Sequence, residues 1–201
     1  MSAAVEQRVA WRVMAIAGAC VVALSGPSSA QAPTPPSGAA KPQSAAPANP
    51  ISRAIVKAWE SAKRNLIESA EQMPESDYEF KPVDQVRTFG QLLAHVAGAN
   101  YVFCSAARGE KSPSSEDAFE KNARTKAAII KALSDSVGYC DVAYKGLTDR
   151  SAAESIALPF DGGDGPRAAA LIDNTGHLNE HYGNLVTYFR IKGMVPPSSR
   201  R

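Results

Sequence analysis

Four long segments of the 201-residue chain carry apolar residues at helical spacing, and this pattern restricts the fold more than any other feature. They cover residues 50–73, 88–109, 115–145 and 167–192. Within each segment apolar side chains recur three or four positions apart, as on the buried face of an amphipathic helix. A short piece at 156–160 is the one extended candidate. Four long helices around one core predict an all-α fold, a four-helix bundle.

The residues at the segment ends predict where the helices begin and end. Asn49 is expected to cap the first helix, with proline at the first helical position. Thr88 and Gln91 have the spacing of a capping box at the start of the second helix. The third helix is expected to run without a break from about 115 to 145, where Gly146 stops it.

The N-terminal residues 1–32 have the three regions of a secretory signal peptide. Arg8 and Arg12 precede an apolar run at 13–24, and small residues follow it. Cleavage is expected after Ala30 or Ala32, which predicts a periplasmic or secreted protein. The run is shorter than the roughly 20 residues that cross a bilayer, so we expect no stable membrane span after cleavage. An uncleaved N-terminal anchor is the alternative.

Residues 33–49 are rich in proline, alanine and serine and carry almost no charge. Such a composition cannot bury enough apolar surface to fold, so it predicts a disordered linker. The remaining residues, 50–199, are enough for one domain with a single core.

The formal net charge of +2 is close to balance, and lysine and arginine do not cluster. We therefore expect no nucleic-acid partner. Cys104 and Cys140 remain after signal cleavage. Two cysteines in an oxidising compartment favour a disulfide, and two buried free thiols are the alternative.

The three histidines of the chain all fall within predicted helices, beside apolar stripes. His177 and His181 are four residues apart, which places their rings about 40° apart on one helix face. His95 lies on the second helix. Three neutral imidazoles from two helices can hold a divalent metal and leave a coordination position for water or substrate. The alternative is three ordinary histidines, at the surface or half-buried, with no metal.

The residues around the histidine pair differ from those of a zinc protease. That motif has glutamate directly after the first histidine, and here Leu178 stands in that place. Glu180 precedes the second histidine and is either a residue that orients a ligand or a solvated surface carboxylate. Asn184 and Tyr188 project to the same side as the pair and are the candidate catalytic residues. Their alternative roles are a helix-interface hydrogen bond and a packed core tyrosine.

Two stretches resemble the DinB-like proteins, the DinB/YfiT superfamily of bacterial four-helix bundles with a three-histidine metal site. One is TFGQLLAHVA at residues 88–97. The other is HLNEHYGNLVTYFR at 177–190, followed by GMVPP at 193–197. The resemblance covers nearly the whole domain.

The resemblance implies that His95, His177 and His181 are the metal ligands and that the metal is divalent, such as zinc, nickel or iron. It also implies homodimers and an activity among hydrolases or thiol-dependent S-transferases and isomerases. We therefore predict an exported DinB-like metal-dependent enzyme, a hydrolase or a thiol S-transferase, that acts on a small-molecule substrate. The alternative is a non-catalytic bundle that binds metal or serves a structural or interaction role.

Overall fold

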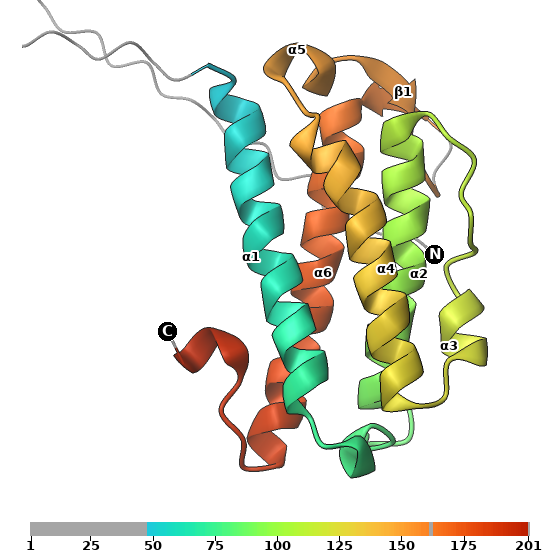
Figure 1. The fold of residues 1–201 in the computed structure, drawn as a ribbon, viewed down its shortest axis with the longest axis vertical. Coiled ribbons are helices and arrows are strands. Elements are labelled where there is room, and N and C mark those ends of the chain that lie inside the picture. Colours follow the sequence, from blue (N-terminus) through green and yellow to red (C-terminus); the bar gives the residue numbers. More distant parts are fainter. Residues whose placement is uncertain (1–47, 161–162, 201) are drawn as a thin grey trace, which may run out of the picture. The chain divides into compact units, whose positions relative to one another are not determined.

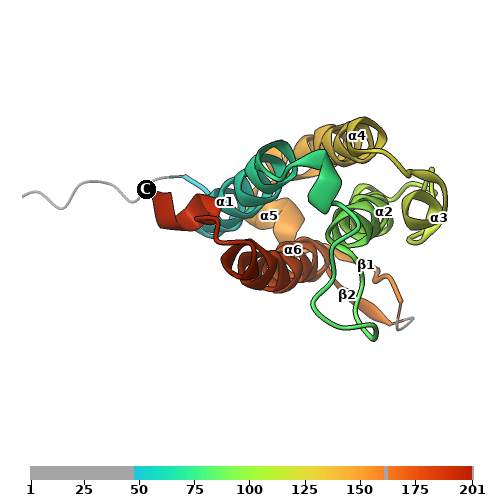
Figure 2. The same cartoon turned by 90° about the horizontal axis from the view of Figure 1, so that it is seen from below.

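A computed structural model of the chain describes residues 48–160 and 163–200. Their long helices are α1 (Pro50–Gln72), α2 (Phe89–Arg108), α4 (Lys126–Lys145) and α6 (Arg167–Ile191), shown in Figure 1. Seen end-on in Figure 2, they pack in the cyclic order α1, α4, α2, α6, so that each contacts two neighbours. The prediction of an all-α four-helix bundle is confirmed. The predicted signal peptide (1–32) lies outside the described residues, as does the linker (33–49) except for 48 and 49.

Large aromatic side chains fill much of the space between the helices. Trp59 of α1 stacks on Tyr144 of α4, with ring centroids 4.3 Å apart and planes at 8°. Phe89 of α2 meets Phe189 of α6 edge to face at 5.6 Å. All four rings are buried. Each such pair contributes roughly 0.5–1.5 kcal/mol beyond the burial of its area.

Two tyrosine hydroxyls hold α6 against its neighbours. The Tyr144 hydroxyl donates to the Leu171 carbonyl of α6 at 2.7 Å. The Tyr188 hydroxyl of α6 donates to the Arg87 carbonyl, just before α2, at 2.7 Å. A buried hydroxyl needs a partner, so these bonds fix how far α6 slides along α4 and α2.

Asn49 and Pro50 start α1 as expected, but the predicted cap by the Asn49 side chain is wrong. Asn49 precedes the helix in a left-handed conformation and makes no capping bond with its side chain. Asp149 caps the helix instead: its Oδ1 accepts from the Ser52 amide at 2.8 Å, and the Asn49 Oδ1 accepts from the Asp149 amide. Asp149 begins the short helix α5 (Asp149–Ala152), so a tertiary contact replaces the local cap.

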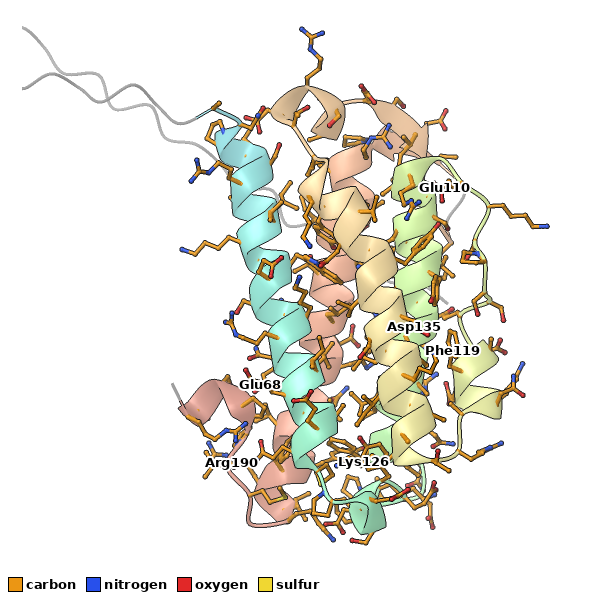
Figure 3. The ribbon with its side chains drawn as sticks, viewed as in Figure 1. Glu68, Glu110, Phe119, Lys126, Asp135 and Arg190 are labelled. Carbon is orange, nitrogen blue, oxygen red and sulfur yellow. A yellow bond between two sulfur atoms is a disulfide. The ribbon has the colours of Figure 1, made fainter. Side chains whose placement is uncertain are left out.

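The predicted third helix is also wrong as a single element. It is divided into a short helix, α3 (Ala118–Asn122), and α4, with 123–125 between them. Thr125 starts α4, and its side chain accepts from the Ala128 amide. Phe119, labelled in Figure 3, stacks on Tyr101 of α2 with centroids 5.8 Å apart. The break lets α3 pack on the side of α2, which a straight continuation of α4 would not reach. The capping box expected at Thr88 is present, and both of its reciprocal hydrogen bonds with Gln91 form.

The connection between α4 and α6 contains more structure than expected. After α5, β1 (Ser155–Ala157) pairs antiparallel with β2 (Asp164–Pro166). The extended piece predicted at 156–160 thus begins a residue earlier and ends at 157, and its partner strand was missed. Two 3₁₀ turns, η1 (Glu75–Asp77) and η2 (Pro197–Arg200), complete the elements. Within the described ranges no helix is both long and apolar enough to cross a membrane.

Cys104 of α2 and Cys140 of α4 form a disulfide, with Cα atoms 5.2 Å apart. Both residues are fully buried. The Asn174 amide of α6 lies 3.6 Å from the Cys104 sulfur and 3.3 Å from the Tyr144 hydroxyl. The cross-link therefore lies in the middle of the bundle, where three helices meet.

Candidate metal centre

The three histidines converge between α2 and α6. His95 Nε2 lies 3.1 Å from His177 Nε2, and His181 Nε2 lies 3.0 Å from the same atom. These three residues form the one group of potential metal ligands found in the described ranges, with ligand atoms within 4.8 Å of one another. Nitrogens bound to one ion at 2.0–2.1 Å are about 2.9–3.4 Å apart at bond angles of 90–110°. The observed spacing fits a shared ion.

Local sequence and long-range contacts both place these rings. The capping box at Thr88 and Gln91 sets the start of α2, and His95 follows one turn after Gln91. On α6 the four-residue spacing stacks His177 and His181 on one face. The bond from Tyr188 to the Arg87 carbonyl then brings that face to the level of His95.

The environment keeps the imidazoles neutral. Burial, together with the neighbouring histidines and Arg87, lowers the pKa of His177 to about 3. Burial, Arg87 and His181 lower the pKa of His95 to about 4. Burial also lowers the pKa of His181, although Glu180 opposes the shift. Neutral imidazole is the form that binds metal, so the ligands need no deprotonation near pH 7.

The ring atoms that face away from the cluster also indicate a metal. The Nδ1 atoms of His177 and His181 are buried and have no hydrogen-bond partner among the described residues. With a proton on each Nδ1, all three Nε2 lone pairs point at one another, which is unfavourable until a cation lies between them. The donor set suits a divalent transition metal, for which imidazole is a common ligand.

Two carboxylates next to the cluster were missed by sequence reasoning. Glu116 Oε1 lies 3.6 Å from His95 Nε2, and Glu120 Oε2 lies 3.8 Å from His95 Nδ1. Arg87 donates to both oxygens of Glu120, at 3.1 Å each. Glu120 lies in α3, and Glu116 lies in the turn just before it. No sequence pattern indicated that this turn packs against α2, so neither carboxylate was assigned to the site.

A cleft of about 740 Å³ opens beside His181. Polar side chains from α2, α3 and α6 line it, and Val86 and Leu92 supply apolar wall. The polar lining residues are Gln85, Arg87, Gln91, Glu120, Glu180, His181, Asn184, Thr187 and Tyr188. A small molecule can therefore approach His181 from solvent and meet both hydrogen-bond donors and acceptors.

The candidate catalytic residues both lie in this cleft. Asn184 is exposed there, with its amide free to face a ligand. Tyr188 is buried, and its hydroxyl donates to the Arg87 carbonyl. Burial raises the pKa of Tyr188, so its proton is held more tightly than in water. Glu180 is exposed at the cleft edge, next to His181.

The DinB superfamily model matches residues 58–185, which include all three histidines and most of the bundle. No curated protein matches the chain.

Solved structures share the fold. YfiT from Bacillus subtilis, described as a probable metal-dependent hydrolase with an unusual four-helix bundle topology, is 19% identical with a TM-score of 0.56, over 79% of this chain and 97% of that one. A DinB-like protein from Bacillus cereus is 16% identical with a TM-score of 0.57, over 72% and 95% of the two chains. A mycothiol-dependent maleylpyruvate isomerase is 15% identical with a TM-score of 0.54; the alignment covers 67% of this chain and 60% of the isomerase.

Proposed function

This chain belongs to the DinB superfamily, and from that premise we propose that it is an exported metal-dependent hydrolase of a small molecule. The observation that carries the proposal is the convergence of three imidazoles, with His177 Nε2 3.1 Å from that of His95 and 3.0 Å from that of His181, next to an open cleft. A metal bound only for stability is expected in a closed site with four protein ligands, whereas catalytic sites keep a position open.

His95, His177 and His181 are the residues that would hold the ion. A divalent ion there would supply a Lewis acid for the substrate and for the attacking water. The protein contributes orientation: Arg87, Gln91 and Asn184 present donors and acceptors along the cleft. Tyr188 holds the backbone of Arg87 in the wall of the cleft by donating to its carbonyl. The buried core of the bundle lies behind the histidines and excludes water from that side.

One comparison and one prediction favour hydrolysis over thiol transfer. A neighbour matched over nearly its whole length is described as a probable metal-dependent hydrolase, whereas the mycothiol-dependent isomerase is matched over 60% of its length. The predicted export would also remove the protein from the cytosolic pool of small thiols. The predicted signal peptide and the buried Cys104–Cys140 disulfide support export, since disulfides persist in oxidising compartments.

The first test is metal content per chain, on protein purified from the periplasm without an affinity tag. Wild type is expected to carry close to one divalent ion, and His95→Ala to carry far less. Asn179→Ala is the control because Asn179 is exposed and points away from both histidines of α6. Metal retained by His95→Ala would contradict a site shared by two helices.

The second test concerns catalysis. The metal-loaded wild type and Asn179→Ala are expected to hydrolyse a member of a panel of small esters and amides, and His95→Ala is expected to lose that activity. If the metal-loaded protein cleaves none of them but transfers a small thiol to an electrophile, it is an S-transferase and not a hydrolase.

A further inference from the structure

The carboxylates of the α3 segment contact His95 at both ring nitrogens. Glu120 lies on the outer, Nδ1 side, at 3.8 Å, and Glu116 lies on the inner, Nε2 side, at 3.6 Å. The inner nitrogen is the one that faces His177. Glu116 is therefore the carboxylate on the side of the ring where a metal and its exogenous ligand would lie.

The two carboxylates differ in their charge partners. Glu120 pairs with Arg87, whose Nε donates to both of its carboxylate oxygens. No lysine or arginine of the described chain lies within ion-pair distance of Glu116. Its side chain keeps 39% of its surface exposed, against 20% for Glu120. Arg87 is the cation that acts on the histidines, and it pairs with Glu120 and not with Glu116. The charge of Glu116 therefore has no direct cationic partner in the part of the chain that the structure describes, and it acts on whatever binds next to His95.

The backbone of Glu116 is held against α2. Gly98 lies one turn after His95, and a Cβ at that position would overlap the Glu116 carbonyl. The absence of a side chain lets the segment before α3 approach the helix at the level of the histidines. The position of Glu116 is therefore built into the packing of α2 and does not depend on its side chain alone.

We propose that Glu116 determines which ligands the open coordination position accepts. Its carboxylate accepts a hydrogen bond from a neutral group with a proton to donate, such as a hydroxyl, an amine or a thiol. It also repels a simple anion, since two like charges about 5 Å apart at a protein surface weaken binding roughly tenfold or more. This inference rests on the proposed function and adds a substrate class: neutral, protic molecules in place of anionic ones.

The test uses cobalt(II)-loaded exported protein and two small probes, azide as an anion and imidazole as a neutral ligand. Visible absorption of the cobalt reports binding and gives the Kd of each probe. Glu116→Gln removes the charge and keeps the shape. Asp117→Asn is the matched control, because it removes a charge one residue away whose side chain pairs with Lys121 and Ser115.

Glu116→Gln is expected to bind azide about tenfold more tightly than wild type, with imidazole binding changed less than about twofold. Asp117→Asn is expected to leave both Kd values near those of wild type. Equal changes in the two variants, or no change in Glu116→Gln, would overturn the inference while leaving the metal site intact. A wild type without cobalt bands would overturn the proposed function and this inference with it. If circular dichroism shows that Glu116→Gln is misfolded, Glu116→Ala is used to repeat the test.

Discussion

His95 Nε2 lies 3.1 Å from His177 Nε2, although 82 positions separate the two residues in the chain. Nothing local requires this approach. It arises because α2 and α6 are neighbours in the ring of helices and because the Tyr188–Arg87 bond sets their relative height. Because the packing of the helices brings the two rings together, the stability of the bundle and metal binding at the histidines are expected to depend on each other.

Zinc added to chelator-treated protein is expected to raise its melting temperature by about 5–10 °C. A ligand at 100 times its Kd stabilises the folded state by roughly 2.7 kcal/mol, and each kcal/mol shifts Tm by about 2–4 °C in a chain of this size. His177→Ala is expected to show a shift below about 2 °C, whereas Asn179→Ala should respond like wild type. Differential scanning fluorimetry measures this; an equal shift in His177→Ala would mean that zinc binds elsewhere.

Glu120→Gln is expected to weaken zinc binding about tenfold. The Glu120 carboxylate lies 3.8 Å from His95 Nδ1 and is held by Arg87, so it can orient the ring and favour the tautomer that leaves Nε2 free for metal. Competition with a chromophoric chelator gives the affinity. Asp117→Asn controls for charge, and a Glu120→Gln affinity equal to that of Asp117→Asn would assign Glu120 to the Arg87 ion pair alone.

The spacing of residues along the sequence was enough to predict which side chains share a face of each helix. His177 and His181 share a face for the same reason that any residues four apart on a helix do. The Thr88 capping box was equally local. By contrast, the cap of α1 comes from Asp149, about 100 positions away, and a local rule assigned it to Asn49.

The carboxylates near His95 could not be predicted for a similar reason. Glu116 faces the site because the chain turns back after α2 and packs against Gly98, and because the third helical segment breaks at 123–125. The apolar spacing of that segment is compatible with one long helix. Only the packing of Phe119 on Tyr101 shows why two helices are preferred.

Gly98→Ala is expected to destabilise the protein by about 1–3 kcal/mol, because a Cβ there overlaps the Glu116 backbone and the segment must move. Gly138→Ala on α4 is the matched control. No atom lies within 4 Å of its added Cβ, and alanine favours a helix by about 0.5–1 kcal/mol over glycine. Urea unfolding should therefore give changes of opposite sign. Stabilisation by both substitutions would show that the Glu116 segment moves away at no cost.

Replacing Cys104 and Cys140 together by alanine is expected to lower the free energy of unfolding by about 4 kcal/mol, given the 36-residue separation that the disulfide closes. Reduction of the wild type should shift its urea midpoint in the same direction. Thiol titration of denatured, unreduced exported protein should find no free thiol. Two reactive thiols per chain would mean that the bridge does not form after export, and would remove one support for an oxidising compartment.

Asp141 is expected to make the free energy of unfolding fall at acid pH. Its carboxylate accepts from Trp59 Nε1 at 2.8 Å and from Lys63 Nζ at 2.7 Å, and it pairs with Lys145 at 2.9 Å. Burial opposes the charge, but the bonds from Lys63, Trp59 and Lys145 outweigh it and lower the pKa of Asp141 below 3.8. A carboxyl group whose pKa is lower in the folded state stabilises the protein above its unfolded pKa, and the contribution is lost as pH falls through the folded pKa.

Asp141→Asn is therefore expected to cost about 1.5–3 kcal/mol at pH 7, the range for hydrogen bonds to a charged group. The difference from wild type should shrink as pH falls below about 4, because the carboxyl group of the unfolded chain is protonated there first and that of the folded protein only at lower pH. Asp135→Asn on the same helix is the control: its pair with Lys131 is exposed, so we expect less than about 0.5 kcal/mol at any pH. Urea unfolding at pH 7, 5 and 3 measures all three proteins. A deficit in Asp141→Asn that stays constant down to pH 3 would mean that the lost stability comes from the shape of the side chain and not from its charge.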